Sequence, residues 1–125
     1  MESPATQRLG LLSCLVSRDE ETNLFLSHCL NFDIIECGHT ADEAWENMKM
    51  AVKFFIEHCY TNYQQGFSYS ADNDEWDEYA CALKSSTKPP RVETIEIEMR
   101  PPLLQEGKPI WMQGVEHGAS CTHVH

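Results

Sequence analysis

The side chains with the clearest capacity for metal chemistry gather at the C-terminal end of the chain. Three imidazoles and one thiol occur within nine residues: His117, Cys121, His123 and His125. Thiolate and imidazole are ligands that zinc, nickel and copper prefer. The spacing matches no structural zinc pattern, and chain termini are often poorly ordered. We therefore keep a metal-binding or thiol-dependent small protein as the alternative function and expect no cofactor in the main one.

A second set of metal-binding residue types lies on two neighbouring predicted strands. The set comprises His28, Cys29, Cys37 and His39. Adjacent residues of a strand point to opposite faces of the sheet. His28 and Cys29 therefore cannot share one site, and we expect no four-ligand centre here.

Carboxylates form a run near the middle of the chain: Asp72, Asp74, Glu75, Asp77 and Glu78. An EF-hand loop needs glycine at its sixth position and glutamate at its twelfth. Counted from Asp72, those positions hold Asp77 and Leu83, so the run is not a calcium loop. It is typical of a solvated helix start, where the macrodipole favours negative charge, or of an acidic docking surface. Glu96 and Glu98 would extend that surface along a strand, or would keep a sheet edge from pairing.

The charge balance narrows the classes of partner. The chain of 125 residues has 9 Lys and Arg against 20 Asp and Glu, a net charge of −11. The chain has no stripe of basic residues, so we expect no direct nucleic-acid ligand. A transcriptional regulator would need such a basic surface. No apolar run approaches the ~18–20 residues that cross a bilayer, and the first residues do not read as a signal peptide. We expect a cytoplasmic protein whose six cysteines are reduced.

The apolar spacing predicts one domain over residues 1–102, with three strands, two helices and a fourth strand in that order. An irregular tail is expected over residues 103–125. The expected strands are 9–17, 24–29, 32–37 and 92–99, and the expected helices are 41–59 and 74–84. Within the tail, residues 110–112 form at most a short strand. The order β-β-β-α-(α)-β predicts an α+β fold, a two-layer sandwich with three or four antiparallel strands.

Side-chain patterns assign faces to these elements. Leu12, Cys14 and Val16 should share one face of the first strand. In the first helix Thr40 and Glu43 form a capping box, and a stripe that includes Ala44 should be buried. Asp72 should cap the second helix, and its inner face should hold Trp76, Tyr79, Ala80 and Leu83.

The segment from Leu30 to Val52 resembles the HicB-type antitoxin domain. Gly38, Thr40, Glu43 and Ala44 match a Gly-x-Thr turn followed by a Glu-Ala helix start, and the resemblance covers roughly residues 9–60. The chain lacks the Pro-Gly that usually precedes the third strand. Its last residues are also too poor in Lys and Arg for the DNA-binding segment of many family members.

The resemblance implies a partial ribonuclease-H-like fold and a non-enzymatic function. Such a protein binds and masks a small basic RNA-cleaving toxin of the HicA type, and self-association to a homo-oligomer is expected. The first strand, Leu9 to Ser17, holds no carboxylate for two-metal catalysis. We expect the partner to contact the acidic residues Asp74, Glu75, Asp77, Glu78, Glu96 and Glu98. Trp45 is expected either in that interface or in the core.

Overall fold

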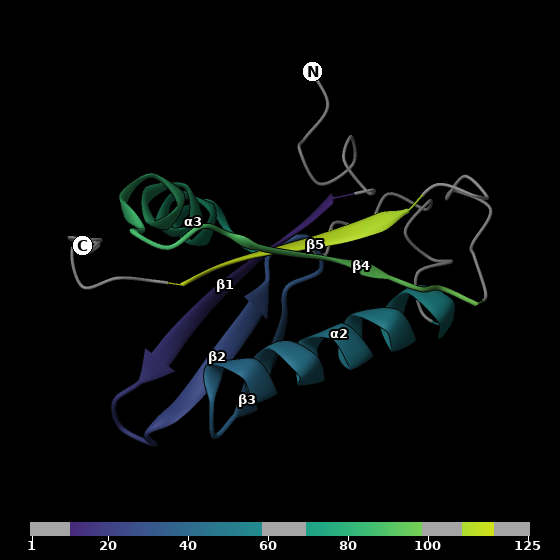
Figure 1. Ribbon diagram of the computed structural model, residues 1–125, viewed down its shortest axis with the longest axis horizontal. Coiled ribbons are helices and arrows are strands. Elements are labelled where there is room, and N and C mark those ends of the chain that lie inside the picture. Colours follow the sequence, from purple (N-terminus) through teal and green to yellow (C-terminus); the bar gives the residue numbers. More distant parts are fainter. Residues whose placement is uncertain (1–10, 59–69, 99–108, 117–125) are drawn as a thin grey trace.

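The computed structural model describes residues 11–58, 70–98 and 109–116 (Figure 1). Two helices and five strands make up an α+β fold with one mixed sheet. In chain order the elements are β1 (Leu11–Asp19), β2 (Leu24–Cys29), β3 (Ile34–Gly38), α2 (Ala41–His58), α3 (Asn73–Ser85), β4 (Arg91–Ile95) and β5 (Ile110–Glu116).

The sheet has the strand order β3-β2-β1-β5-β4. β1, β2 and β3 form the expected antiparallel meander. β5 lies parallel to β1 and antiparallel to β4. The predicted sheet of three or four antiparallel strands is therefore wrong in its size and in one pairing. The short strand allowed at residues 110–112 is present, but it continues to Glu116 and occupies an interior position of the sheet, so the irregular tail is wrong for residues 113–116.

The two helices cover opposite faces of the sheet (Figure 1). Leu12, Cys14 and Val16 of β1 are buried with α2, as expected. Leu15, from the other face of the same strand, is buried with Tyr79 of α3. The molecule thus has three layers, and the predicted two-layer sandwich is wrong. Amphipathic spacing shows that a helix packs on a sheet but does not say on which face.

α2 begins with the predicted cap. The Thr40 hydroxyl accepts a hydrogen bond from the Glu43 backbone N–H at 3.0 Å. The Glu43 carboxylate accepts the backbone N–H of His39 at 3.2 Å, one residue earlier than in a standard capping box. Ala44 is buried as predicted, and the rest of the buried stripe is Trp45, Met48, Val52 and Ile56.

Gly38 is required where β3 meets the start of α2, but not for the reason expected. A glycine that ends the third expected strand predicts a position where the chain needs freedom in φ, yet the φ of Gly38 lies outside the left-handed region. A Cβ here would lie 2.8 Å from the backbone carbonyl carbon of Glu43. The requirement is space, because α2 begins in direct contact with the end of β3.

α3 occupies nearly the predicted residues, with a different inner face. Tyr79 and Ala82 are buried and Trp76 is partly buried, whereas Ala80 and Leu83 are exposed. Asp72 is the N-cap residue but makes no side-chain capping hydrogen bond. The rotation of the helix is set by its contacts with β1 and β5, which the local spacing did not contain.

The cysteines differ from one another in their state. Cys14 and Cys29 are buried free thiols and Cys37 is an exposed one, as the expectation of reduced cysteines required. Cys81 is disulfide-bonded, so that expectation is wrong at this position. Burial raises the pKa of the Cys14 thiol well above its usual value, which makes it unreactive.

None of the helices in the described ranges has the length and apolar character needed to cross a membrane.

Candidate functional site

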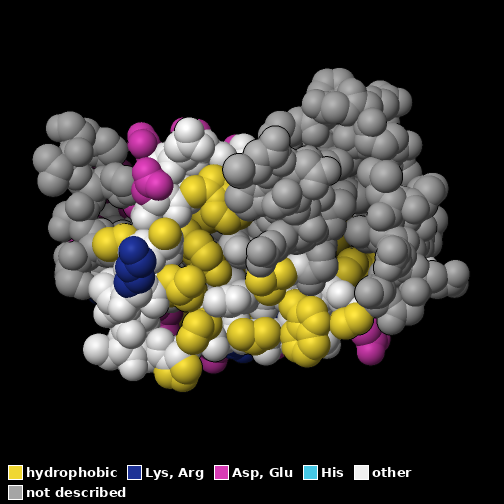
Figure 2. All heavy atoms as spheres, turned by 90° about the horizontal axis from the view of Figure 1, so that it is seen from above, with side chains coloured by type: hydrophobic (Ala, Val, Ile, Leu, Met, Phe, Trp, Pro, Cys, Tyr) yellow, Lys and Arg dark blue, Asp and Glu magenta, His cyan; other side chains and the backbone are white. Residues whose placement is uncertain are grey.

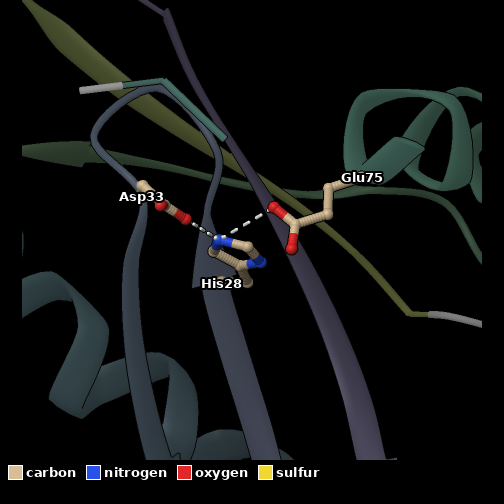
Figure 3. Close-up of side chains that lie close together, drawn as sticks. All are labelled: His28, Asp33 and Glu75. Carbon is tan, nitrogen blue, oxygen red and sulfur yellow. Dashed lines mark hydrogen bonds and ion pairs between the residues drawn. The ribbon is translucent and has the colours of Figure 1, made fainter. Parts of the chain in front are cut away.

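His28, Asp33 and Glu75 come together on the face of the sheet that α3 covers (Figure 3). The His28 Nε2 atom lies 2.7 Å from an oxygen of Asp33 and 3.6 Å from an oxygen of Glu75. One potential ligand atom from each residue lies within 4.8 Å of the other two. A β-strand, a turn and a helix thus each contribute one side chain.

Strand alternation explains why His28 points toward α3. Its neighbours Ser27 and Cys29 are both fully buried, and Cys29 belongs to the core beneath α2. His28 must therefore project from the opposite face. The sequence argument that His28 and Cys29 cannot share a site is correct for this reason.

The turn between β2 and β3 places Asp33 beside His28. Asp33 has a φ of 56°, the left-handed conformation that Asp tolerates better than most residues. The buried Asn31 braces this turn, because its side-chain oxygen accepts the Ser13 backbone N–H at 2.7 Å. The turn is therefore held against β1 rather than free to swing.

A backbone contact brings the start of α3 to the same turn. The Ala71 N–H donates to the Leu30 carbonyl at 2.8 Å, and α3 begins two residues later, at Asn73. Glu75 therefore enters the site from the first turn of the helix. These hydrogen bonds hold all three groups near one another without any contribution from the site itself.

The cluster of His28, Asp33 and Glu75 is strongly negative and partly shielded from water. The side chain of His28 is 13% exposed and that of Glu75 39%. Burial raises the pKa of Glu75, the nearby carboxylates Asp72 and Asp33 add to this increase, and His28 opposes it. No lysine or arginine of the described ranges pairs with Asp33 or Glu75. The arrangement can accept a proton or a metal cation.

Sequence reasoning found only part of this cluster. It selected Glu75, but as one member of an acidic docking surface. The sequence argument excludes His28 as a co-ligand of Cys29, and it places Asp33 inside the expected strand 32–37, which in the structure begins only at Ile34. The missing information was tertiary: α3 follows β2 by more than forty residues, and no local pattern pairs them.

The acidic residues predicted to bind a partner fall on opposite faces. Asp74 and Asp77 are exposed on α3, and acidic side chains lie at the left end of the molecule, where Figure 1 places α3 (Figure 2). Glu96 and Glu98 instead line a groove of about 320 Å³ beside α2. Within the described part of the chain, the single continuous acidic surface that we expected is not formed.

The groove lies between α2 and the end of β4. Its lining residues are Glu46, Lys49, Met50, Lys53, Thr94, Ile95, Glu96 and Glu98. Lys49 pairs with Glu93 at 2.7 Å, and Lys53 pairs with Glu57 at 2.8 Å. Both lysines thus have carboxylate partners within the protein, and carboxylates predominate around the groove.

Trp45 lies in the core, one of the two places that the sequence left open for it. The side chain is 1% exposed, so the core alternative is confirmed and Trp45 is not available for direct contact with a partner. Its indole N–H donates to Glu93 at 2.7 Å, and the Arg91 guanidinium lies 5.2 Å from the ring centroid. Trp45 therefore joins the core to the charged residues of β4.

The predicted metal ligands His117, Cys121, His123 and His125 lie outside the described residues. Comparison with protein-family models, with curated proteins and with solved structures finds no match to this chain. Its function must therefore be inferred from the residues and contacts above.

Proposed function

We propose that this protein is a non-enzymatic interaction module resembling the HicB-type antitoxins, with a partial ribonuclease-H-like fold. It binds and masks a small basic protein such as an RNA-cleaving toxin of the HicA type. The observation that carries the proposal is the succession of a three-stranded antiparallel meander and a capped helix packed across it. This succession, with Gly38 at the junction, is the order that the resemblance implies.

The composition of β1 supports a function other than ribonuclease-H-type catalysis. Two-metal sites need carboxylates that hold the ions between them. β1 holds no Asp or Glu before Asp19. That terminal residue accepts the Thr22 hydroxyl at 2.6 Å in the turn to β2.

The groove between α2 and β4 supports a basic partner. Its lining holds three carboxylates, Glu46, Glu96 and Glu98, and two lysines. Two further carboxylates, Glu93 and Glu57, pair with those lysines. The excess negative charge attracts a basic protein and speeds its association at low salt. The exposed side chains of Met50 and Phe54, on the outer side of α2, supply apolar area beside it.

The other face of the sheet supports self-association. Val92 and Trp111 are exposed apolar residues. Strand alternation places both on the face of the sheet that carries α3. They stay exposed although α3 packs on this face against β1 and β5. Hydrophobic side chains spread across this view of the molecule (Figure 2). We therefore include a homo-oligomer in the proposal, whereas the cytoplasmic location stays a prediction from the sequence.

The test is affinity capture followed by charge reversal. The protein is used to capture proteins from host lysate at about 0.15 M salt, and bound proteins are eluted at high salt. We expect a small basic protein, whose affinity for the purified chain is then measured by calorimetry. The variant Glu96→Lys/Glu98→Lys should weaken that affinity at least tenfold.

The matched control is Asp74→Lys/Asp77→Lys, which makes the same change of charge on α3. It should weaken the complex by less than threefold, since these residues lie on the other face of the sheet. Equal losses in both variants would mean that net charge, not the groove, attracts the partner. Capture of acidic or neutral proteins alone would contradict the proposal.

A further inference from the structure

We propose that His28, Asp33 and Glu75 bind one divalent metal ion of the zinc class (Figure 3). This site shares no residue with the groove, and it extends beyond the interaction function proposed above. The ion would connect α3 to the turn between β2 and β3.

The donor set favours a borderline transition-metal ion. One imidazole nitrogen and two carboxylate oxygens are ligands that Zn²⁺ takes with bonds of about 2.0–2.2 Å. Ca²⁺ takes at least six oxygen ligands, and Mg²⁺ keeps several of its waters. The imidazole therefore selects against both of these ions, while three protein ligands and one open position suit zinc.

The distances require only small movements. Ligand atoms of a tetrahedral zinc site lie about 3.3 Å apart, given bonds of about 2 Å. The separations of His28 Nε2 from its two carboxylates, 2.7 Å and 3.6 Å, fall on either side of this value. The ligand atoms of Asp33 and Glu75 lie within 4.8 Å of one another, so rotation of these two side chains can bring both carboxylates to an ion while the braced turn and the start of α3 keep their backbones in place.

The charges supply a reason for a cation to enter. Asp33 and Glu75 face one imidazole, and the carboxylates of Asp72 and Glu78 lie near enough to act on Glu75. A divalent ion bound at Nε2 would replace the contact between His28 and Asp33 and compensate this negative charge. Asp33 is 52% exposed, so solvent can supply the fourth ligand and the ion can enter from outside.

The experiment uses the full-length chain with the histidines of the C-terminal segment removed: His117→Ala, His123→Ala and His125→Ala. This background is freed of metal with chelator and titrated with Zn²⁺ by calorimetry at pH 7. We expect one equivalent to bind and the midpoint of thermal unfolding to rise with Zn²⁺ concentration. Mg²⁺ at the same concentration should leave the midpoint unchanged.

Three further variants in this background locate the site. Glu75→Gln and Asp33→Asn each remove one charged ligand at a partly exposed position, and each should weaken Zn²⁺ binding at least tenfold. Asp77→Asn removes an equal charge from the exposed side of α3 and should change affinity less than twofold. Circular dichroism without metal verifies that all three variants fold.

Two results would overturn the proposal. One is the absence of a one-equivalent binding event in the background protein. The other is an equal affinity in Glu75→Gln, Asp33→Asn and Asp77→Asn, which would place the ion elsewhere on the acidic surface.

Discussion

Glu93 accepts three hydrogen bonds, two of which, from Trp45 and Lys49, hold α2 against β4. Lys49 donates to it from α2 at 2.7 Å, the Trp45 indole donates at 2.7 Å, and Arg91 donates at 2.8 Å. Hydrogen bonds to an ionised carboxylate are stronger than those between neutral groups. The Lys49 ammonium contributes most to lowering the pKa of Glu93, to about 2, with further contributions from Arg91 and Trp45.

Replacing Glu93 by glutamine should destabilise the protein in a pH-dependent way. The carboxyl pKa is lower in the folded than in the unfolded state, so ionised Glu93 adds stability above pH about 4.5, which is lost as the pH falls through about 2. The side chain is 32% exposed, so solvent screening reduces the effect to about 1–2 kcal/mol at pH 7. Urea unfolding of Glu93→Gln at pH 7 and pH 3 measures this loss, which should be smaller at pH 3.

The matched control for this prediction is Glu96→Gln, an exposed carboxylate that directly follows the end of β4. Its unfolding free energy should change by less than about 0.5 kcal/mol. A loss in Glu93→Gln that does not diminish between pH 7 and pH 3 would show that packing, not charge, accounts for the effect.

The two helices differ in whether side chains accept hydrogen bonds from the backbone N–H groups at their N-terminal ends. At α2 the Thr40 hydroxyl accepts the Glu43 N–H, and the Glu43 carboxylate accepts the His39 N–H. This interaction is the main reason that the pKa of Glu43 is lowered. At α3 the cap position is Asp72, whose carboxylate makes no capping hydrogen bond. Each helix has a capping residue with a glutamate three residues later, but this pattern produces side-chain capping hydrogen bonds only in α2.

Removal of the two cap side chains should have unequal effects. Thr40→Ala leaves the Glu43 N–H without its acceptor and should cost about 1 kcal/mol of unfolding free energy. Asp72→Ala removes no capping bond, so its cost should be less than half as large, measured by urea unfolding at pH 7. Equal costs in the two variants would contradict the difference in geometry.

At the scale of elements, local sequence patterns predicted the packing correctly wherever elements that are consecutive in the chain also contact each other in space. The meander β1–β2–β3 and the helix that follows at Gly38 were predicted because each contacts the next along the chain. The inner face of α3 was not, since Tyr79 and Ala82 are buried against β1 and β5. β1 lies far before α3 in the sequence and β5 lies after it. The helical period alone does not determine which side of α3 faces the sheet.

At the scale of the whole molecule, β5 completes the sheet. It lies between β1 and β4 and contributes to both cores: Ile110 and Met112 pack beneath α2, and Val115 packs beneath α3, while Trp111 is exposed. Gly114 is necessary in this position because a Cβ would overlap the ring of Trp45. Apolar residues on both faces of the strand obscure the alternation that marks a strand in a sequence, and the glycine weakens that signal further.

A charge introduced on one face of β5 should unfold the protein, while the neighbouring position should tolerate it. Met112 is fully buried, so Met112→Lys places an unpaired ammonium in the core and should cost more than about 3 kcal/mol. Gln113 is half-buried on the other face, and Gln113→Lys should cost less than about 1 kcal/mol. Thermal unfolding followed by circular dichroism measures both, and similar midpoints would contradict the interior position of β5.

The sequence by itself determined the acidic character of the chain, the meander and the capped α2. These follow from composition and from contacts between residues close in the chain. Only the tertiary structure decided the three layers, the place of β5, the burial of Trp45 and the meeting of His28 with Asp33 and Glu75. Each of these depends on elements distant in sequence, whose pairing is set by the burial of complementary faces, and no local spacing records which faces will meet.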